Sequence, residues 1–360
     1  MKLFIQLVIW LVVLSGIIVL TSPNGTPTIE YIKKRFDRMT PPNEASPPIK
    51  TRPASPPNRC DRGKSNGYKT RYNRIYQWAD KNGRTQVSDS PPTGQHTNLR
   101  IKNHKVNSFF KLTIDDSQAN LPAYTKDHLE AGVKKIYKTL KNVLKVSEIR
   151  STELRLKFIS NKKSFHAYRQ QVAPDTNYQT TGFYTDILHQ STIWAVGDRR
   201  HITRIAMHEA THAIVAGMFG GAPTWLNEGL ASFFEKQVIT GNDVYSYELI
   251  NEHLKTLHSS PLPSLKHHFS QTHQQWHDPR RSNLNYAVDW SLIYYLMHSD
   301  KGRGLIRSLL DNVAIASCNG LNAEQFIQKN YKGGLSALEA GWKTWLQKAR
   351  PNTMITIHGF

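Results

Sequence analysis

The residues with the clearest chemical potential are two histidines and a glutamate in the sequence HEATH, residues 208–212. On a helix, His208 and His212 would lie one turn apart on the same face, so that both imidazoles reach one metal ion. Glu209 would lie about 100° round the helix, beside the ion and not on it. From there its carboxylate can take a proton from water, as the general base of metallopeptidases does. The structural alternatives are a solvent-facing histidine pair or a core histidine bonded to a backbone carbonyl.

A third metal ligand is expected in the next helix. Glu228 lies 16 residues after His212, in the sequence PTWLNEGLASFFEK, and Gly220-Gly221 separates the two helical patterns. So short a turn lets the two helices pack and carries Glu228 back toward the histidines. Two imidazoles and a carboxylate leave one position open on zinc, which is the His₂Glu pattern of catalytic sites. The alternative for Glu228 is an ordinary surface carboxylate.

The elements that must position these side chains show a change of character along the chain. Strand patterns occupy residues 108–115, 153–160, 179–184 and 191–196, with helical patterns at 124–145 and 162–172. After Asp198 helical spacing dominates, at 201–218, 224–236, 284–298, 303–316, 322–331 and 334–348. Strands first and helices after predict an α+β domain over 108–350, a sheet lobe followed by a helical lobe. Residues 351–360 are assigned to a tail.

The sequence HEATHA followed by WLNEGLA resembles the gluzincin clan of zinc peptidases, especially its peptidase MA-like branch. The similarity is closest over residues 205–235 and looser over 108–350. It implies a thermolysin-like zincin fold in which His208, His212 and Glu228 bind Zn²⁺ and Glu209 activates water. It also implies an edge strand along the cleft, and residues 191–196 are the candidate strand for binding an extended peptide.

The same resemblance suggests a role for Tyr286, which lies 58 residues after Glu228 in an amphipathic helical pattern. In aminopeptidase-like gluzincins a tyrosine at a similar distance donates to the oxyanion, because a phenol stabilises charge that develops on the carbonyl oxygen. A core tyrosine is the alternative. The Gly-Met-Glu-Asn motif by which aminopeptidases hold a free amino terminus is absent, which favours an endopeptidase. No carboxylate that would orient either histidine can be identified from the sequence.

Six further histidines cluster in one part of the chain, at positions 253, 258, 267, 268, 273 and 277. Residues 257–283 are rich in Ser, Pro and Gln, and they predict a long polar loop or a lid over the cleft. A second metal site is the less favoured alternative, because no fixed ligand spacing is present.

The amino-terminal third has a different organisation. An uncharged apolar run within residues 1–22 predicts a signal or a membrane anchor, and residues 23–66 form a basic, proline-rich linker. Residues 67–107 predict a small β module built on a hairpin. Its Y-x-W-x-D-x-x-G run ending in S-D-x-P-P resembles a small domain of unknown function in proteobacterial envelope proteins, which implies the periplasmic face of the inner membrane, anchored or secreted. Cys60 and Cys318 would be able to pair in such a compartment.

Composition excludes several classes of protein. Of 360 residues 39% are hydrophobic, so wholesale disorder is excluded, and two cysteines exclude a disulfide-rich scaffold. The net charge of +20, from 47 basic and 27 acidic residues, favours contact with an anionic cell wall or lipid, whereas export disfavours a nucleic-acid partner. The sequence thus predicts an envelope zinc peptidase acting on a peptide or protein. The rival is an envelope binding or assembly factor with a structural or vestigial zinc site.

Overall fold

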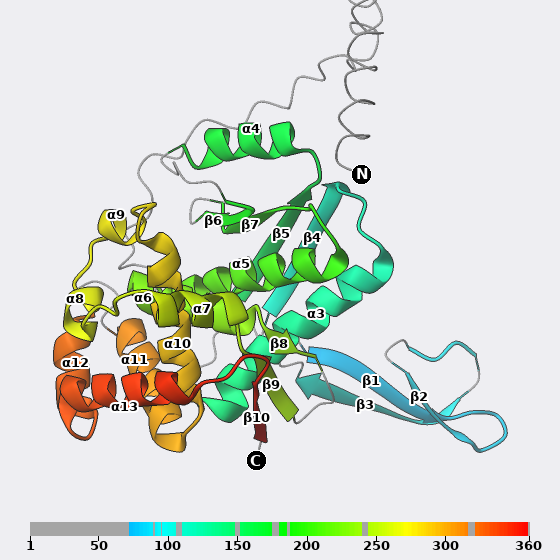
Figure 1. The fold of residues 1–360 in the computed structure, drawn as a ribbon. Coiled ribbons are helices and arrows are strands. Elements are labelled where there is room, and N and C mark those ends of the chain that lie inside the picture. Colours follow the sequence, from blue (N-terminus) through cyan, green and yellow to red (C-terminus); the bar gives the residue numbers. More distant parts are fainter. Residues whose placement is uncertain are drawn as a thin grey trace, which may run out of the picture. The chain divides into compact units, whose positions relative to one another are not determined.

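The computed structural model describes residues 72–88, 91–94, 96–105, 110–147, 152–174, 180–185, 188–239, 244–315 and 321–358 (Figure 1). The predicted membrane segment, the proline-rich linker and both cysteines lie outside these residues. Within them, no helix combines the length and the apolar character needed to cross a bilayer.

A three-stranded antiparallel sheet lies in the segment predicted to be a small β module. Its strands are β1 (Tyr72–Ala79), β2 (Thr85–Ser88) and β3 (Thr97–Lys105), in the order β2-β1-β3. The turn after β1 is closed by Asp80, whose carboxylate accepts hydrogen bonds from the backbone N–H groups of Asn82 and Arg84 at 2.9 and 3.0 Å. The third strand adds to the two-stranded hairpin that the sequence predicts.

The largest sheet has four strands in the order β4-β5-β7-β6. They are β4 (Phe110–Gln118), β5 (Thr152–Ile159), β6 (Gly182–Thr185) and β7 (Gln190–Trp194). β4, β5 and β7 are parallel, and β6 is antiparallel to β7. Parallel neighbours need crossover connections, so helices alternate with strands here and the fold is mixed α/β. The predicted edge strand at 191–196 is wrong, because β7 is internal and β6 forms the edge.

Helices cover both faces of this sheet. The side chains of α4 (Lys162–Val172) pack on one face, where Phe165 meets Ile159 and Phe183 in a small core cluster. On the other face Leu154, Leu156 and Phe158 join the main core with α3 (Ala123–Lys138) and α5 (Arg199–Phe219), and a π-helical turn, η2 (Thr139–Val143), extends α3.

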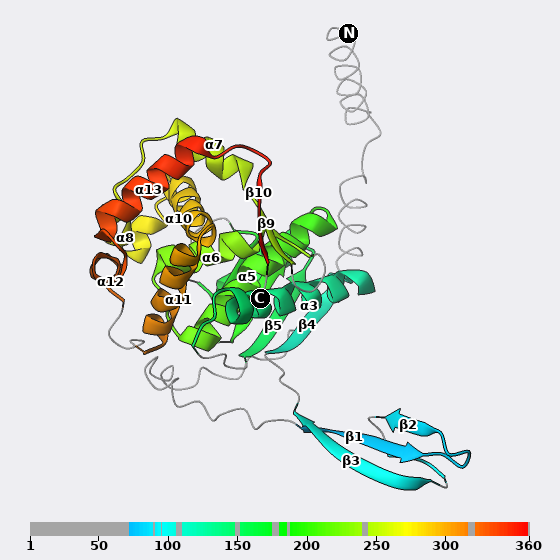
Figure 2. The same ribbon diagram turned by 90° about the horizontal axis from the view of Figure 1, so that it is seen from below.

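A helical region follows α5 in the chain and lies beside it (Figures 1 and 2). Its members are α6 (Thr224–Phe234), α7 (Asn251–Ser259), α8 (Leu265–Phe269), α9 (His273–Trp276), α10 (Ser282–Met297), α11 (Asp300–Ile315), α12 (Ala323–Asn330) and α13 (Gly334–Lys348). The central helix is α10, which packs against α6, α7, α11 and α13. α6 approaches it closely at Gly229, where an added Cβ would lie 2.7 Å from the Asp289 carbonyl oxygen.

A third sheet ties the end of the chain to the domain. It contains β8 (Gln237–Val238), β9 (Val244–Glu248) and β10 (Met354–His358), all antiparallel, in the order β10-β9-β8. Along β10, Ile355 and Ile357 are buried while their neighbours are exposed. Residues 354–358 are therefore part of the fold, which corrects the assignment of 351–360 to a tail.

Candidate metal centre

The HEATH sequence lies in the middle of α5, a 21-residue helix with clear ends. At its start the Asp198 side chain accepts a hydrogen bond from the His201 backbone N–H at 2.8 Å, and it ends at Gly220, where φ is 86°. Such a φ favours glycine at a helix C-terminus. The Ser191 hydroxyl on β7 donates to the Glu209 carbonyl oxygen at 2.9 Å. This bond fixes the helix to the sheet at the motif itself.

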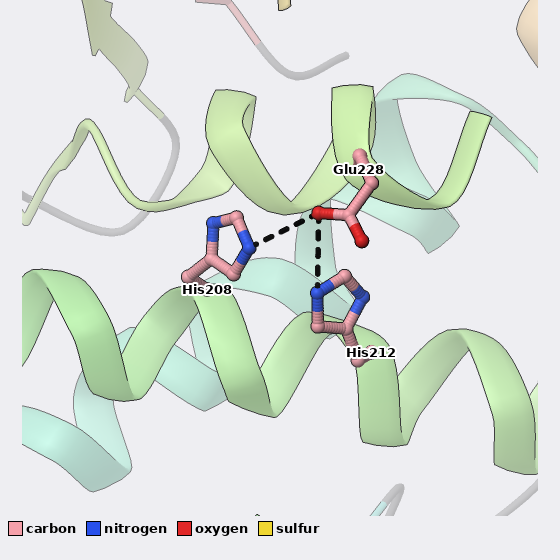
Figure 3. Close-up of side chains that lie close together, drawn as sticks. All are labelled: His208, His212 and Glu228. Carbon is pink, nitrogen blue, oxygen red and sulfur yellow. Dashed lines mark ion pairs between the residues drawn. The ribbon is translucent and has the colours of Figure 1, made fainter. Parts of the chain in front are cut away.

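Three side chains converge between α5 and α6 (Figure 3). The Glu228 Oε2 atom lies 3.4 Å from His208 Nε2 and 3.6 Å from His212 Nε2, and one donor atom from each of the three residues lies within 4.8 Å of the others. Two ligands of a tetrahedral zinc ion, each bonded at about 2.05 Å, stand about 3.3 Å apart. Glu228 Oε2 is buried without a hydrogen-bond partner. The three residues therefore fit a zinc ion in both donor chemistry and spacing.

Glu209 lies beside this group and is only 6% exposed. The strand β6 passes close to it: a Cβ added to Gly182 would lie 2.8 Å from Glu209 Oε1. Burial raises the pKa of Glu209 to about 8, with a further rise from Glu228 and Glu235 and an opposing effect of His208. The positive charge of a cation on the three ligands would favour the ionised carboxylate. Ionised, Glu209 is an acceptor for a proton at this point.

A third carboxylate, that of Glu235, supports the first histidine. Glu235 Oε2 lies 3.1 Å from His208 Nδ1, so Nε2 is left to face Glu228, and Glu235 Oε1 accepts a bond from Arg204 at 2.9 Å. Burial would raise the pKa of Glu235, but the bond to His208 and the charges of His208 and Arg204 lower it to about 2. Glu235 was not among the residues predicted from the sequence. Its spacing of seven from Glu228, two helical turns on the same face, is the signal that would have found it.

Glu235→Gln is expected to weaken zinc binding by about 10- to 100-fold, the usual effect of losing a group that orients a histidine ligand. The neutral amide lacks the negative charge that attracts the His208 N–H group. It also leaves Arg204 without its ion-pair partner. The measurement is a competition titration of zinc against a chromogenic chelator. Glu248→Gln is the matched control, because Glu248 also pairs with an arginine of α5, Arg200, but contacts no ligand. Equal zinc affinity in both variants would contradict the role of Glu235.

The metal-binding residues open into a cleft of about 370 Å³. It is lined by Glu209 and Tyr286 as well as the three ligands, so all five site residues expected from the sequence share one cavity. The ring centroid of Tyr286, on α10, lies 6.4 Å from that of His208 and 4.5 Å from that of Trp276.

The segment predicted as a long loop also reaches this cleft. It forms α8 and α9 instead, and His273 and His277 line the wall together with His253. In the part of the chain that the structure describes, the three-residue group of His208, His212 and Glu228 is the one whose donor atoms are close enough for a metal, so the histidine cluster supplies no second such group.

A buried polar network holds α8 and α9 against α10. The His268 ring contacts the Asp289 carboxylate, Trp276 Nε1 donates to Asp289 Oδ2 at 2.8 Å, and Asn285 Nδ2 donates to the Trp276 carbonyl oxygen at 2.8 Å. All four side chains are at most 2% exposed. Burial raises the pKa of Asp289 to about 6 against the opposing effects of His268 and Trp276. Because buried polar groups are costly when left unpaired, this network fixes the segment that presents His273 and His277 to the cleft.

Part of the chain is similar to a known protein family. Residues 173–348 match the family model described as the Peptidase MA superfamily, and no curated protein matches the chain. The matched segment runs from before β6 to the end of α13 and contains all the site residues discussed above. The members of this superfamily are peptidases, and they are usually zinc-dependent. Residues 173–348 are therefore similar to the peptidase MA superfamily.

Proposed function

We propose that this protein is a zinc-dependent endopeptidase of the cell envelope. The observation that carries the proposal is a carboxyl group, Glu209, set beside three converging ligands in an open cleft. A structural zinc site has no use for such a base, whereas peptide hydrolysis needs one. This argues for an enzyme over a binding or assembly factor with a vestigial site.

Each residue of the site has a distinct task in hydrolysis. A zinc ion on His208, His212 and Glu228 would supply a Lewis acid that polarises the scissile carbonyl and makes water more acidic. Glu209 takes the proton of the attacking water and delivers it to the leaving amine, so that one group serves as base and then as acid. Glu235 keeps His208 in the tautomer and orientation that a ligand needs.

The cleft offers an extended peptide a place to bind. Among the residues that the structure describes, the edge strand β6 pairs only with β7, and residues 180–184 line the cleft. The free side of an edge strand can pair with the backbone of a substrate. A second cavity of about 480 Å³ shares His212, Asn227 and Glu228 with the first and continues along Gly220, Gly221 and Ala222. Space on both sides of the ligands suits a chain that is cut internally.

The envelope location and the class of substrate are proposed from the sequence. The apolar segment at 1–22 would anchor or export the domain through the inner membrane, and the module at 67–107 resembles one of envelope proteins. The net charge of +20 would favour a peptide or protein substrate near anionic cell wall or lipid.

The proposal is tested by incubating the zinc-loaded full chain with denatured casein and identifying the products by mass spectrometry. Internal fragments that disappear with 1,10-phenanthroline and return with added zinc are expected. Stepwise loss of single residues from one end would contradict an endopeptidase. A zinc-replete protein that cleaves none of a panel of unfolded proteins would favour the binding factor.

Tyr286→Phe is expected to lower kcat by about 10²- to 10³-fold with little change in KM, because the phenol would donate to the oxyanion that forms in the transition state. The substitution keeps the ring that packs on Trp276 and faces His208, and it removes only the hydroxyl. Zinc content and melting temperature are measured in parallel and should match the wild type. Unchanged kcat would assign Tyr286 to packing alone.

A further inference from the structure

A separate cavity of about 300 Å³ lies on the other side of Glu235 from the metal-binding residues. Its walls come from α3, the first turns of α5, the end of α6, and the strands β8 and β9. Glu235 lines both this cavity and the metal cleft, whereas His208, His212 and Glu228 do not line this cavity. The peptidase mechanism gives no task to the other residues that line this 300 Å³ cavity.

The cavity carries an excess of positive charge. Arg199, Arg200, Arg204 and Lys236 line it, against the two carboxylates of Glu235 and Glu248, which leaves a net charge of 4 − 2 = +2. His128 adds no charge near neutral pH, because burial and the nearby Arg199 lower its pKa.

Both carboxylates are already engaged. Glu248 accepts two bonds from Arg200, at 3.0 and 3.1 Å, and Glu235 is shared between Arg204 and His208. The two remaining cations have no carboxylate of their own among the described residues. Arg199 lies over the Tyr124 ring, with 5.2 Å from Cζ to the centroid, and this contact leaves its N–H donors free to bind.

Lys236 is half-buried, and burial lowers its pKa, with a further contribution from Arg204 and an opposing effect of the nearby carboxylates Glu235, Glu252 and Glu248. Within the described part of the chain its ammonium makes no ion pair. A desolvated cation of this kind gains strongly from an anionic partner.

Two further donors in the same walls lack hydrogen-bond partners. Thr203 is 7% exposed, and its Oγ1 atom is buried without a hydrogen-bond partner in the described structure. The Arg204 Nε atom is likewise buried without a hydrogen-bond partner there. Buried donors are normally bonded, so unpaired ones that surround a cationic cavity indicate a missing acceptor. Gln237 Oε1, an unpaired acceptor, lines the cavity as well. A ligand that accepts from several donors and also carries a hydroxyl would satisfy all three groups.

We propose that this cavity binds a phosphate group, either as free hydrogen phosphate or as the head of a phosphate monoester. Either dianion would neutralise the excess charge of +2, and its oxygens would accept from Lys236, Thr203 and Arg204 Nε. The donor to Gln237 Oε1 would be the P–OH group of hydrogen phosphate or, in a monoester, a hydroxyl of the esterified alcohol. Charge-assisted bonds from arginine and lysine are the strong ones in phosphate recognition. The site is independent of the peptidase assignment, since it uses no metal ligand.

Isothermal titration calorimetry of the full chain with inorganic phosphate tests the proposal, at constant ionic strength in chloride buffer. Saturable one-to-one binding is expected, both in zinc-loaded protein and after zinc removal. Glycerol 3-phosphate is titrated in parallel: tighter binding than inorganic phosphate identifies a monoester as the ligand, and weaker binding identifies the free ion. Binding that is lost with the metal would place the anion at the zinc site and overturn the proposal.

Three variants make the test specific. Lys236→Gln is expected to weaken binding about tenfold or more, because a hydrogen bond to a charged group is lost. Thr203→Val should weaken it several-fold without lowering the melting temperature, because the hydroxyl bonds nothing in the ligand-free structure. Lys329→Gln, an exposed lysine of α12 outside the cavity, removes the same charge and should bind as the wild type does. Non-saturable heats, or equal weakening in Lys329→Gln and Lys236→Gln, would reduce the effect to general attraction by the basic surface and overturn the site.

Discussion

Replacement of Glu209 by glutamine is expected to lower peptide hydrolysis by about 10²- to 10⁴-fold while the zinc content stays unchanged. The amide has the shape of the carboxylate but cannot accept a proton from water. Glu209 touches no metal ligand through a hydrogen bond in the described structure, and it lies against Gly182, where a glutamine of equal size fits. The measurement is kcat/KM on a quenched fluorescent peptide, with metal content determined on the same sample.

The variant also separates the two functional hypotheses. Its melting temperature is expected to equal or exceed that of the wild type, because a buried carboxyl whose pKa is raised to about 8 is replaced by a neutral group. An enzyme loses activity and keeps zinc. If the purified variant retained wild-type hydrolysis, the general-base role would be wrong, and a contaminating peptidase or a different mechanism would have to account for the activity.

The part of the site that could be predicted is the part that follows from local helix geometry. His208, Glu209 and His212 are neighbours on one helix, so their arrangement follows once residues 201–218 are assigned as helical. Glu228 required one more step, the short connection at Gly220-Gly221 that folds α6 back on α5. The structure brings it to the two imidazoles as expected.

What the sequence did not reveal depends on contacts between segments distant in the chain. β6 and β7 are adjacent in sequence and both have strand character, so nothing local tells that β7 inserts beside β5 and leaves β6 at the edge. β10 pairs with β9, which lies more than 100 residues earlier in the chain. No hydrophobic pattern within residues 351–360 can indicate that partner.

The histidine-rich segment shows the same limit in another form. Polar composition predicted a surface loop over 257–283, but His268 is buried because Asp289, on a helix further along the chain, is there to pair with it. That pairing, together with the Trp276 bond to the same carboxylate, turns a polar stretch into a fixed wall of the cleft. Single-residue composition carries no information on such partners.

Glu228→Ala is expected to reduce the zinc content from about one ion per chain to nearly none. The two remaining histidines supply neither the negative charge nor the third protein ligand that a catalytic zinc site requires. Zinc that binds only the native state stabilises the protein, and the gain in free energy of unfolding rises with the logarithm of the free zinc concentration divided by Kd. The gain is about 4 kcal/mol when the free zinc concentration is 1,000 times Kd. The rise in melting temperature that zinc produces in the wild type should therefore vanish in the variant. Metal content after dialysis and melting curves at increasing zinc concentration provide the two measurements.

The metal-free forms give the control that makes this result decisive. Glu228 is buried beside two imidazoles and its Oε2 atom has no hydrogen-bond partner in the described structure, so its removal breaks no hydrogen bond of that atom and the variant should remain folded by circular dichroism. Glu130→Ala, at an exposed position of α3, removes the same side chain away from the site and should keep both the zinc ion and the thermal shift. Loss of zinc in Glu228→Ala alone establishes the ligand. Retention of a stoichiometric ion in that variant would mean that another group completes the site. His277 is then the first residue to replace, because it lines the same cleft and is near enough to Glu228 to lower the pKa of that carboxyl.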